Sequence, residues 1–256
     1  MKSAGKFRPV KHTVARILLF WPTALVIGLG KLLIILSDTP LGRFTLRPIF
    51  RTFTRWVLYA RSLPALRRRN PTQTLPTGAL KELISSARYI AVLPCACRAT
   101  GHKCSHPLHK FHNGETCLGF GFSAILQELS GLGRKVTVEE ALRICEISAQ
   151  TGLVHHAILS FGMLTEVCNC CKESCSVFLA LRRGIHNVVR PSGWIPVRGN
   201  DCDACENRPE RICVEICPYA EGPGSLACMG CGLCAYHCPN QAIKMVPKSS
   251  SFGKPL

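Results

Sequence analysis

Two cysteine runs decide the fold of the C-terminal part of this chain: Cys202-x2-Cys205-x7-Cys213-x3-Cys217-Pro218 and Cys228-x2-Cys231-x2-Cys234-x3-Cys238-Pro239. In this spacing three thiolates of one run surround an iron-sulfur cubane while the fourth cysteine reaches the neighbouring one. The proline after each fourth cysteine fixes φ and removes a backbone donor where the chain has to turn away. The two runs therefore predict a pair of 4Fe-4S clusters with exchanged fourth ligands.

The exchange assigns each cysteine to a cluster. We expect one cluster to be held by Cys202, Cys205, Cys213 and Cys238, and the other by Cys228, Cys231, Cys234 and Cys217. Paired C-x2-C units also bind zinc or form disulfides, which is the alternative interpretation. Neither alternative requires a Cys-Pro ending that occurs twice, so the spacing favours iron-sulfur clusters over zinc.

Residues 195 to 247 resemble the bacterial two-cluster ferredoxins. Besides the two cysteine runs, the resemblance includes Cys238-Pro239-Asn240-Gln241-Ala242-Ile243, which is similar to the usual exit from a cluster into a short strand. The seven residues between Cys205 and Cys213 depart from the simplest pattern of that family and lengthen one loop. The resemblance implies that this part transfers single electrons.

Length and cysteine content restrict the class of protein. The chain has 256 residues, of which 47% are hydrophobic, so it is long enough for two compact domains and is not disordered throughout. Its 17 cysteines exceed what an ordinary core uses. No cleavable signal peptide with an A-x-A-like site is visible, and thiolates that bind iron must stay reduced. We therefore expect the protein at the cytoplasmic face of a membrane.

Positive charge is concentrated at the N-terminus. Residues 1–69 hold 14 Lys and Arg against one acid, a net +13 of the total +17. This segment is as apolar as it is basic, and no nucleic-acid-binding motif accompanies it, which makes a nucleic-acid partner unlikely on sequence grounds. An anionic membrane surface is the partner that the charge favours.

The segment 1–70 is predicted to associate with a membrane through helices. Ile17 to Leu36 is 20 mostly apolar residues, long enough to cross a bilayer, although Lys31 interrupts it. Arginines then recur at every fourth position beside aromatic and aliphatic residues, a pattern typical of a helix in the headgroup plane: Arg43, Arg47, Arg51 and Arg55. The alternative is that both stretches are soluble core helices. The turn-rich residues 71–77 are interpreted as a linker.

A second set of thiols lies between this linker and the ferredoxin-like part. They belong to a predicted middle domain, residues 78–190, and are Cys95, Cys97, Cys104, Cys117, Cys168, Cys170, Cys171 and Cys175. The pattern predicts a helix over Gly78 to Ala87, a strand over Tyr89 to Leu93, and a helix that begins at a capping box, Thr137-x-x-Glu140, and ends at Gly152. We expect a mostly helical domain with the thiols in its loops.

The motifs C-x-C-R at Cys95 and C-N-C-C at Cys168 resemble an iron-sulfur protein family of anaerobic and respiratory microbes, in which such a module precedes a two-cluster ferredoxin segment. The resemblance covers residues 78 to 247 and implies redox function without a named substrate. Lys172-Glu173-Ser174-Cys175 departs from the denser cysteines of that family. The sequence leaves three roles open for the eight middle thiols: binding one or two further clusters, binding a single metal ion, or thiol chemistry. Cys145 remains outside both sets, as a small buried hydrophobe.

Together these observations predict an α+β protein with a membrane-associating N-terminus, a cysteine-rich middle domain and a ferredoxin-like domain at residues 191–256. We expect it to pass single electrons as a subunit of, or feeder to, a membrane-associated oxidoreductase. One alternative is a reductase whose middle module is a catalytic metal site, and another is a redox sensor or scaffold. No sequence feature identifies a catalytic residue.

Overall fold

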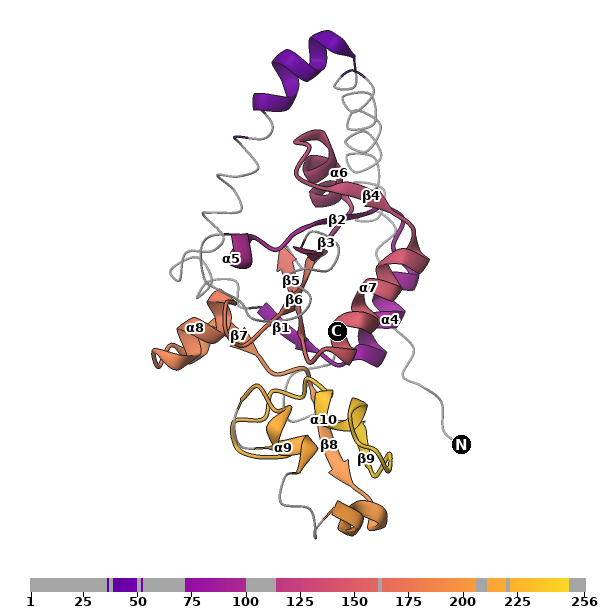
Figure 1. Ribbon diagram of the computed structural model, residues 1–256, viewed down its shortest axis with the longest axis vertical. Coiled ribbons are helices and arrows are strands. Elements are labelled where there is room, and N and C mark those ends of the chain that lie inside the picture. Colours follow the sequence, from indigo (N-terminus) through magenta and orange to yellow (C-terminus); the bar gives the residue numbers. More distant parts are fainter. Residues whose placement is uncertain are drawn as a thin grey trace, which may run out of the picture.

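The computed structural model describes residues 36, 39–49, 52, 72–99, 114–160, 163–205, 211–219 and 222–248. Two sheets organise these residues, a large one in the middle of the chain and a small one near its C-terminus (Figure 1). The strands are β1 (Thr72–Leu75), β2 (Ile90–Pro94), β3 (Glu115–Phe120), β4 (Arg134–Val136), β5 (Val154–Ser160), β6 (Met163–Cys170), β7 (Val189–Arg190), β8 (Trp194–Arg198) and β9 (Ile243–Pro247). The helices are α4 (Thr77–Ser85), α5 (Ala96–Ala99), α6 (Phe122–Leu129), α7 (Val138–Gln150), α8 (Ser176–Arg182), α9 (Ile212–Glu215) and α10 (Leu233–Tyr236), with the short 3-10 helices η3 (His186–Val188) and η4 (Asn200–Cys205).

The large sheet has seven strands in the order β4-β2-β3-β6-β5-β1-β7. All neighbours are antiparallel except β1 and β7, which run parallel. Its central pair is β5 and β6, joined from Val154 opposite Cys170 to Ser160 opposite Met163. This pair carries the chemistry described below.

Strand alternation divides the sheet into two buried faces. One face packs under α4 and α7, in a core that includes Leu80, Ile84, Ile144 and Cys145. On the opposite face α6 covers one part with Ile125 and Leu129. Another part is covered by α8, whose Val177 and Phe178 lie in one buried cluster with Val154, Cys170 and Cys175. Both faces of the sheet are covered, so groups on either face are shielded from water.

Two predictions for this region are wrong. The middle domain is not mostly helical, because its helices pack on the two faces of a seven-stranded sheet. Residues 71–77 are not a linker, since Thr72–Leu75 forms β1, which pairs with both β5 and β7, and α4 begins at Thr77. Pro76 follows this short strand directly and precedes α4. Three of the four residues of β1 are buried, so pairing within the sheet outweighs the turn residues around it.

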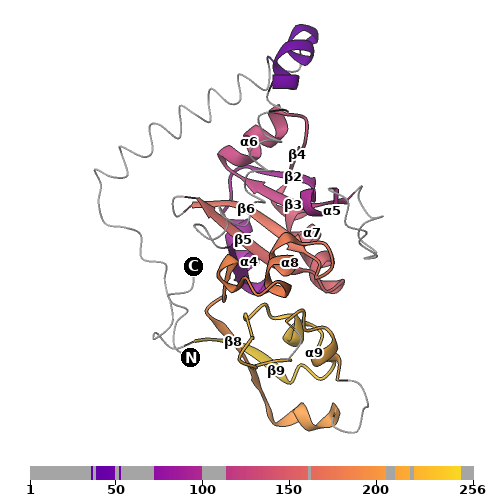
Figure 2. The same ribbon diagram turned by 90° about the vertical axis from the view of Figure 1, so that its left-hand side faces the viewer.

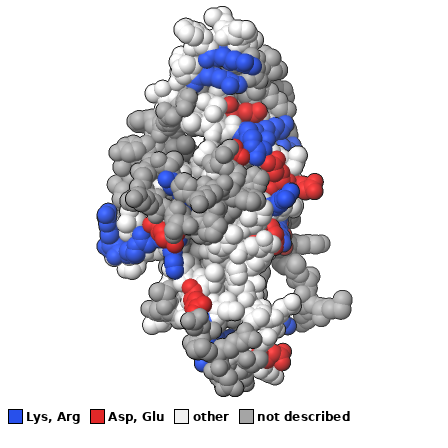
Figure 3. Space-filling model, viewed as in Figure 1, with Lys and Arg blue, Asp and Glu red and all other residues white. Residues whose placement is uncertain are grey.

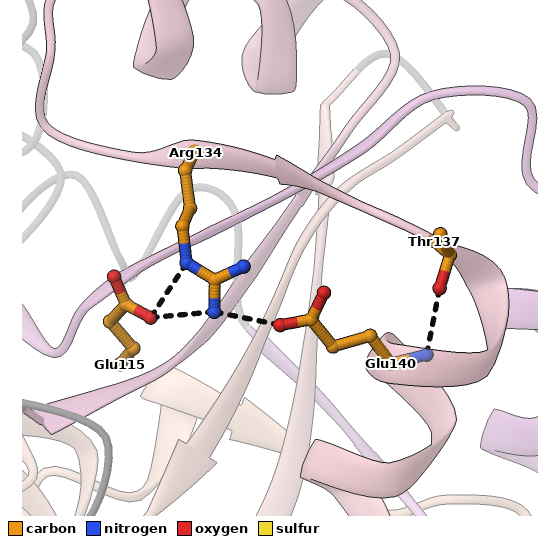
Figure 4. Close-up of polar contacts among 4 residues, drawn as sticks. All are labelled: Glu115, Arg134, Thr137 and Glu140. Carbon is orange, nitrogen blue, oxygen red and sulfur yellow. Dashed lines mark hydrogen bonds and ion pairs between the residues drawn. The ribbon is translucent and has the colours of Figure 1, made fainter.

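The predicted start of α7 is confirmed. The hydroxyl oxygen of Thr137 accepts a hydrogen bond from the backbone N–H of Glu140, 3.1 Å away, as an N-cap does. The Glu140 carboxylate contacts Arg134 at 2.7 Å, and Arg134 also donates to Glu115 of β3 at 2.9 Å (Figure 4). These contacts tie the start of α7 to the edge of the sheet.

The chain passes from the large sheet to the small one within residues 191–193, between β7 and β8. β8 and β9 pair antiparallel from Trp194 opposite Pro247 to Arg198 opposite Ile243, with α9, α10 and η4 beside them. Figure 2 shows this unit below the large sheet. The Tyr236 hydroxyl donates to Glu146 of α7 at 2.5 Å, and His237 Nε2 contacts the Ala149 carbonyl oxygen at 2.9 Å. The two units are therefore joined through the C-terminal half of α7.

Little of the predicted membrane segment lies within the described residues. Residues 40–49 form a helix, and three of its apolar side chains are exposed: Leu41 by 74%, Phe44 by 83% and Ile49 by 66%. Basic side chains lie among uncharged ones at the tip of the molecule where Figure 1 places this helix (Figure 3). The predicted span Ile17 to Leu36 falls outside the described residues except for Leu36. Among the helices that the structure describes, none has the length and apolar character needed to span a bilayer.

Candidate metal centres

One cavity of the small unit is lined by the four cysteines assigned to the first predicted cluster. Cys202 and Cys205 come from η4, Cys213 from α9, and Cys238 from the turn after α10. The backbone N–H of Ala242 donates to the sulfur of Cys238 at 3.3 Å. Arg198 and Arg211 also line this cavity. The fourth thiol therefore comes from the second cysteine run, as the exchange of ligands requires.

The other four cysteines line a second cavity: Cys217, Cys228, Cys231 and Cys234. Burial raises the pKa of Cys231 to about 12 and that of Cys234 to about 11, so both thiols need a cation to ionise at neutral pH. Gly230 and Gly232 flank Cys231, each with a positive φ, which lets the chain curve around the cavity. No charged side chain is found among the described residues that line it.

Donor type and number in both cavities fit a 4Fe-4S cluster. Each cavity collects four sulfur atoms, which is the ligand set of a cubane, and each takes three from one run and one from the other. Backbone amides that point at thiolate sulfur, such as Ala242 N–H, are typical of such sites.

A scan against protein-family models matches residues 226–244 to the 4Fe-4S binding domain. The match supports an iron-sulfur domain of the ferredoxin type in this segment. The match includes Cys228, Cys231, Cys234 and Cys238, and it supports at least one 4Fe-4S cluster and electron transfer in general. Neither a curated protein nor a solved structure matches the chain.

The middle cysteines gather on the face of the large sheet that α8 covers. Six of their thiols hydrogen-bond to one another in a closed ring, which we call the thiol ring. In the order of contact its members are Cys95, Cys97, Cys175, Cys170, Cys168 and Cys117, and Cys117 contacts Cys95 again. Four of them are buried, and Cys97 and Cys168 are partly buried. Predicted thiols that lie far apart in sequence are thus brought together by the sheet.

Strand geometry explains which thiols enter the ring. Cys168 and Cys170 are two residues apart on β6, so their side chains point to the same face, while Asn169 points to the other. Cys171 follows the end of β6 and packs instead against Leu153 and Ile147. Of this adjacent pair, Cys170 therefore belongs to the thiol ring, whereas Cys171 packs outside it.

The pKa values of the ring thiols are driven apart by their contacts. Hydrogen bonds from Cys175 and Cys95 hold the pKa of Cys97 well below its ordinary value. Hydrogen bonds to Cys168 and Cys95, with burial, raise that of Cys117 far above it. The pKa of Cys170 is raised in the same way, by Cys168 and Cys175 and by burial. Without a cation, the ring can thus carry few thiolates at once.

A buried arginine lies beside the ring. Arg98, which ends the C-x-C-R motif, is 5% exposed and donates to the Thr116 hydroxyl at 2.8 Å and to the Asn169 carbonyl oxygen at 3.1 Å. Its guanidinium also hydrogen-bonds with Cys171 and interacts electrostatically with Cys95 and other thiols. Its Nε has no hydrogen-bond partner among the described residues.

His156 joins the ring to the ferredoxin unit. One ring nitrogen of His156 and the sulfurs of Cys170 and Cys175 all lie within 4.8 Å of one another, a spacing suited to a shared metal. The Nε2 of His156 is 3.2 Å from the hydroxyl of Tyr219, which follows the first ferredoxin run. Phe178 of α8 contacts both rings, with centroids 5.6 Å from His156 and 5.4 Å from Tyr219.

Neighbouring His155 faces the other side of the sheet. Its Nδ1 is 2.6 Å from Asn169 Oδ1, and burial lowers its pKa to about 4. Both histidines lie on β5 rather than at the exit of α7, so they do not serve its C-terminal dipole. Cys145 is fully buried in the opposite core, as expected, and Cys104 lies outside the described residues.

Sequence reasoning missed His156, Arg98 and Tyr219 as members of this site. The signals were present: His156 shares a strand face with Val154 and Ile158 in β5, and Arg98 directly follows a cysteine pair. Their significance depends on the strand pairing, which places His156 opposite Cys168.

Proposed function

We propose that this chain is an electron-transfer protein that passes single electrons through two 4Fe-4S clusters in its C-terminal unit. The observation that carries the proposal is the pair of four-thiol cavities with exchanged fourth ligands. Cys202, Cys205, Cys213 and Cys238 would hold one cluster, and Cys217, Cys228, Cys231 and Cys234 the other. When bound, such clusters accept and release one electron each at potentials set by charge, hydrogen bonds to sulfur and exposure.

The chain places different charges around the two cavities. Arg198, Arg211 and Asp201 line the first, which leaves one net positive charge, while apolar groups and glycines line the second. Positive charge favours the more negative, reduced state of a cluster, and burial without compensating charge opposes it. We expect the first cavity to hold the site of higher potential, so that electrons move from the second cavity toward the first.

The partner we propose is a larger oxidoreductase at the cytoplasmic face of a membrane. The +13 charge of residues 1–69 supports attachment to anionic lipid. The helix at residues 40–49 supports it further, because Leu41, Phe44 and Ile49 are exposed next to basic residues.

The exchange of fourth ligands gives the proposal its sharpest test. In anaerobically purified protein, Cys231→Ala should remove the paramagnetic signal of the second site, and Cys217→Ala should remove the same signal although it alters the first run. Cys238→Ala should remove the other signal. Cys145→Ala, a buried cysteine outside all sites, is the matched control and should keep both.

The readouts are the iron and acid-labile sulfide content and the electron paramagnetic resonance of the reduced protein. We expect at least about eight iron per chain from the two ferredoxin sites. A zinc-loaded, iron-free protein would overturn the proposal, as would loss of one and the same signal in Cys231→Ala and Cys238→Ala.

A further inference from the structure

The ferredoxin unit does not use the thiol ring, which lies on a different sheet. Its cysteines come from the residue after β2, from α5, β3 and β6, and from the start of α8. We propose that the thiol ring and His156 hold a third metal centre, an iron-sulfur cluster separate from the two ferredoxin clusters. The argument rests on the number of donors, on their chemistry, and on the charge of Arg98.

The number of donors exceeds what one mononuclear ion uses. A structural zinc ion takes four ligands in a tetrahedron, whereas six thiols touch in the ring and an imidazole nitrogen lies within 4.8 Å of two of them. Among the described residues, His156, Cys170 and Cys175 form the one group whose donor atoms all lie within 4.8 Å of one another, and the contacts of the other four ring thiols continue from it. A polynuclear centre explains this arrangement, because it spreads its ligands over several metal atoms.

The chemistry of the donors selects the metal. Thiolates are soft ligands that favour iron-sulfur clusters, zinc and Cu(I) over hard cations such as Mg²⁺. His156 adds a nitrogen ligand, which iron-sulfur centres also accept. Its Nε2 is in hydrogen-bonding range of the Tyr219 hydroxyl, an outer contact of the type that orients ligating imidazoles.

The charge of Arg98 requires negative partners. A buried guanidinium is costly unless it is paired with opposite charge. Among the described residues no ion pair joins Arg98 to a carboxylate, and residues 100–113, the adjoining stretch outside them, contain no Asp or Glu. The groups that its guanidinium faces are instead the sulfur atoms of Cys95, Cys117 and Cys171, the last by a hydrogen bond. A thiolate-bound, anionic centre supplies the missing negative charge.

The centre would lie beside the second ferredoxin cavity. Cys231 of that cavity belongs to the same buried cluster as Cys170 and Cys175, and Tyr219 interacts electrostatically with all three. On the proposed function, one electron leaves the middle centre, which is oxidised, and reduces the second ferredoxin site, from which it passes to the first, with no bond or proton transferred.

The test measures iron and sulfide in the anaerobically purified full chain and in ring variants. We expect about twelve iron per chain, falling by about four in Cys170→Ala and in Cys97→Ala, while both ferredoxin signals remain. Cys97 is only partly buried, so its replacement carries less risk to folding than that of Cys170. Cys145→Ala is the control and should keep the full iron content. His156→Asn should change the spectrum of the third centre specifically.

A second set of variants separates this proposal from the first. Combined replacement of Cys213 and Cys228 by Ala should remove the ferredoxin signals and leave about four iron per chain, bound in the middle domain. Three results would each overturn the third centre and leave the ferredoxin proposal standing. These are an unchanged iron content in the ring variants, zinc in place of iron, and disulfides between ring cysteines in the native protein.

Discussion

Gly230 is the position where one added methyl group should disable one ferredoxin site and spare the other. It lies next to Cys231 with φ of +66°, and a Cβ there would be 2.1 Å from the Trp194 carbonyl oxygen. An ordinary contact begins near 3.4 Å, so the backbone of β8 or of the cysteine loop must shift by about 1.3 Å in Gly230→Ala.

The size of the effect follows from what that shift breaks. Alanine in the left-handed region costs about 1 to 2 kcal/mol relative to glycine. The shift also breaks the hydrogen bond from Ser192 Oγ to the Gly230 carbonyl, at 2.7 Å, and the one from Ser192 N–H to the Met229 carbonyl, at 2.9 Å. At about 0.5 to 1.5 kcal/mol each, these bonds add about 1 to 3 kcal/mol.

Gly224→Ala is the matched control, because Gly224 has φ of +78° but a Cβ there has no neighbour closer than 3.9 Å. Both variants incur the conformational cost, and only Gly230→Ala breaks the hydrogen bonds. The difference of about 1 to 3 kcal/mol corresponds to a roughly 5-fold to 150-fold smaller population of loops able to hold the second cluster.

Electron paramagnetic resonance of the reduced protein, with iron content, measures the outcome. We expect Gly230→Ala to lose the signal that Cys231→Ala loses and to keep the signal that depends on Cys238. Equal iron content and equal spectra in the Gly230→Ala and Gly224→Ala proteins would refute this account of the loop.

Two further expectations concern acid and the membrane. Burial lowers the pKa of His155 to about 4, against an ordinary 6.5, so its contribution of about 3 kcal/mol to stability is complete above pH 6.5 and is lost as pH falls through 4. In urea unfolding of metal-free protein, the free energy of unfolding should therefore fall more steeply with decreasing pH in wild type than in His155→Gln. Equal dependence of this free energy on pH in the two proteins would contradict the expectation. The full chain should sediment with anionic vesicles, more weakly at high salt, whereas a chain that begins at Pro71 and so keeps β1 should stay in the supernatant with its ferredoxin clusters. Sedimentation of neither protein would contradict the membrane proposal.

The grouping of the ferredoxin cysteines around two cavities could be predicted from sequence because these cysteines are close along the chain. Spacings such as Cys228-x2-Cys231-x2-Cys234 bring three sulfurs around one point by local geometry alone, and the fourth sulfur, that of Cys217, comes from the other run. The start of α7 was predictable for the same reason, since the Thr137 cap acts on a backbone group only three residues away.

The middle site was decided by tertiary structure. Cys95, Cys117 and Cys170 come from three different strands or their ends, and only the order β2-β3-β6 in the sheet makes their side chains meet. The alternation of β6 determines that Cys170 enters the ring and Cys171 does not. The pairing of β5 with β6 likewise brings His156 to the thiols and turns His155 away. Sequence by itself determined which residue types were available, and strand register, which depends on long-range burial, determined which of them share a site.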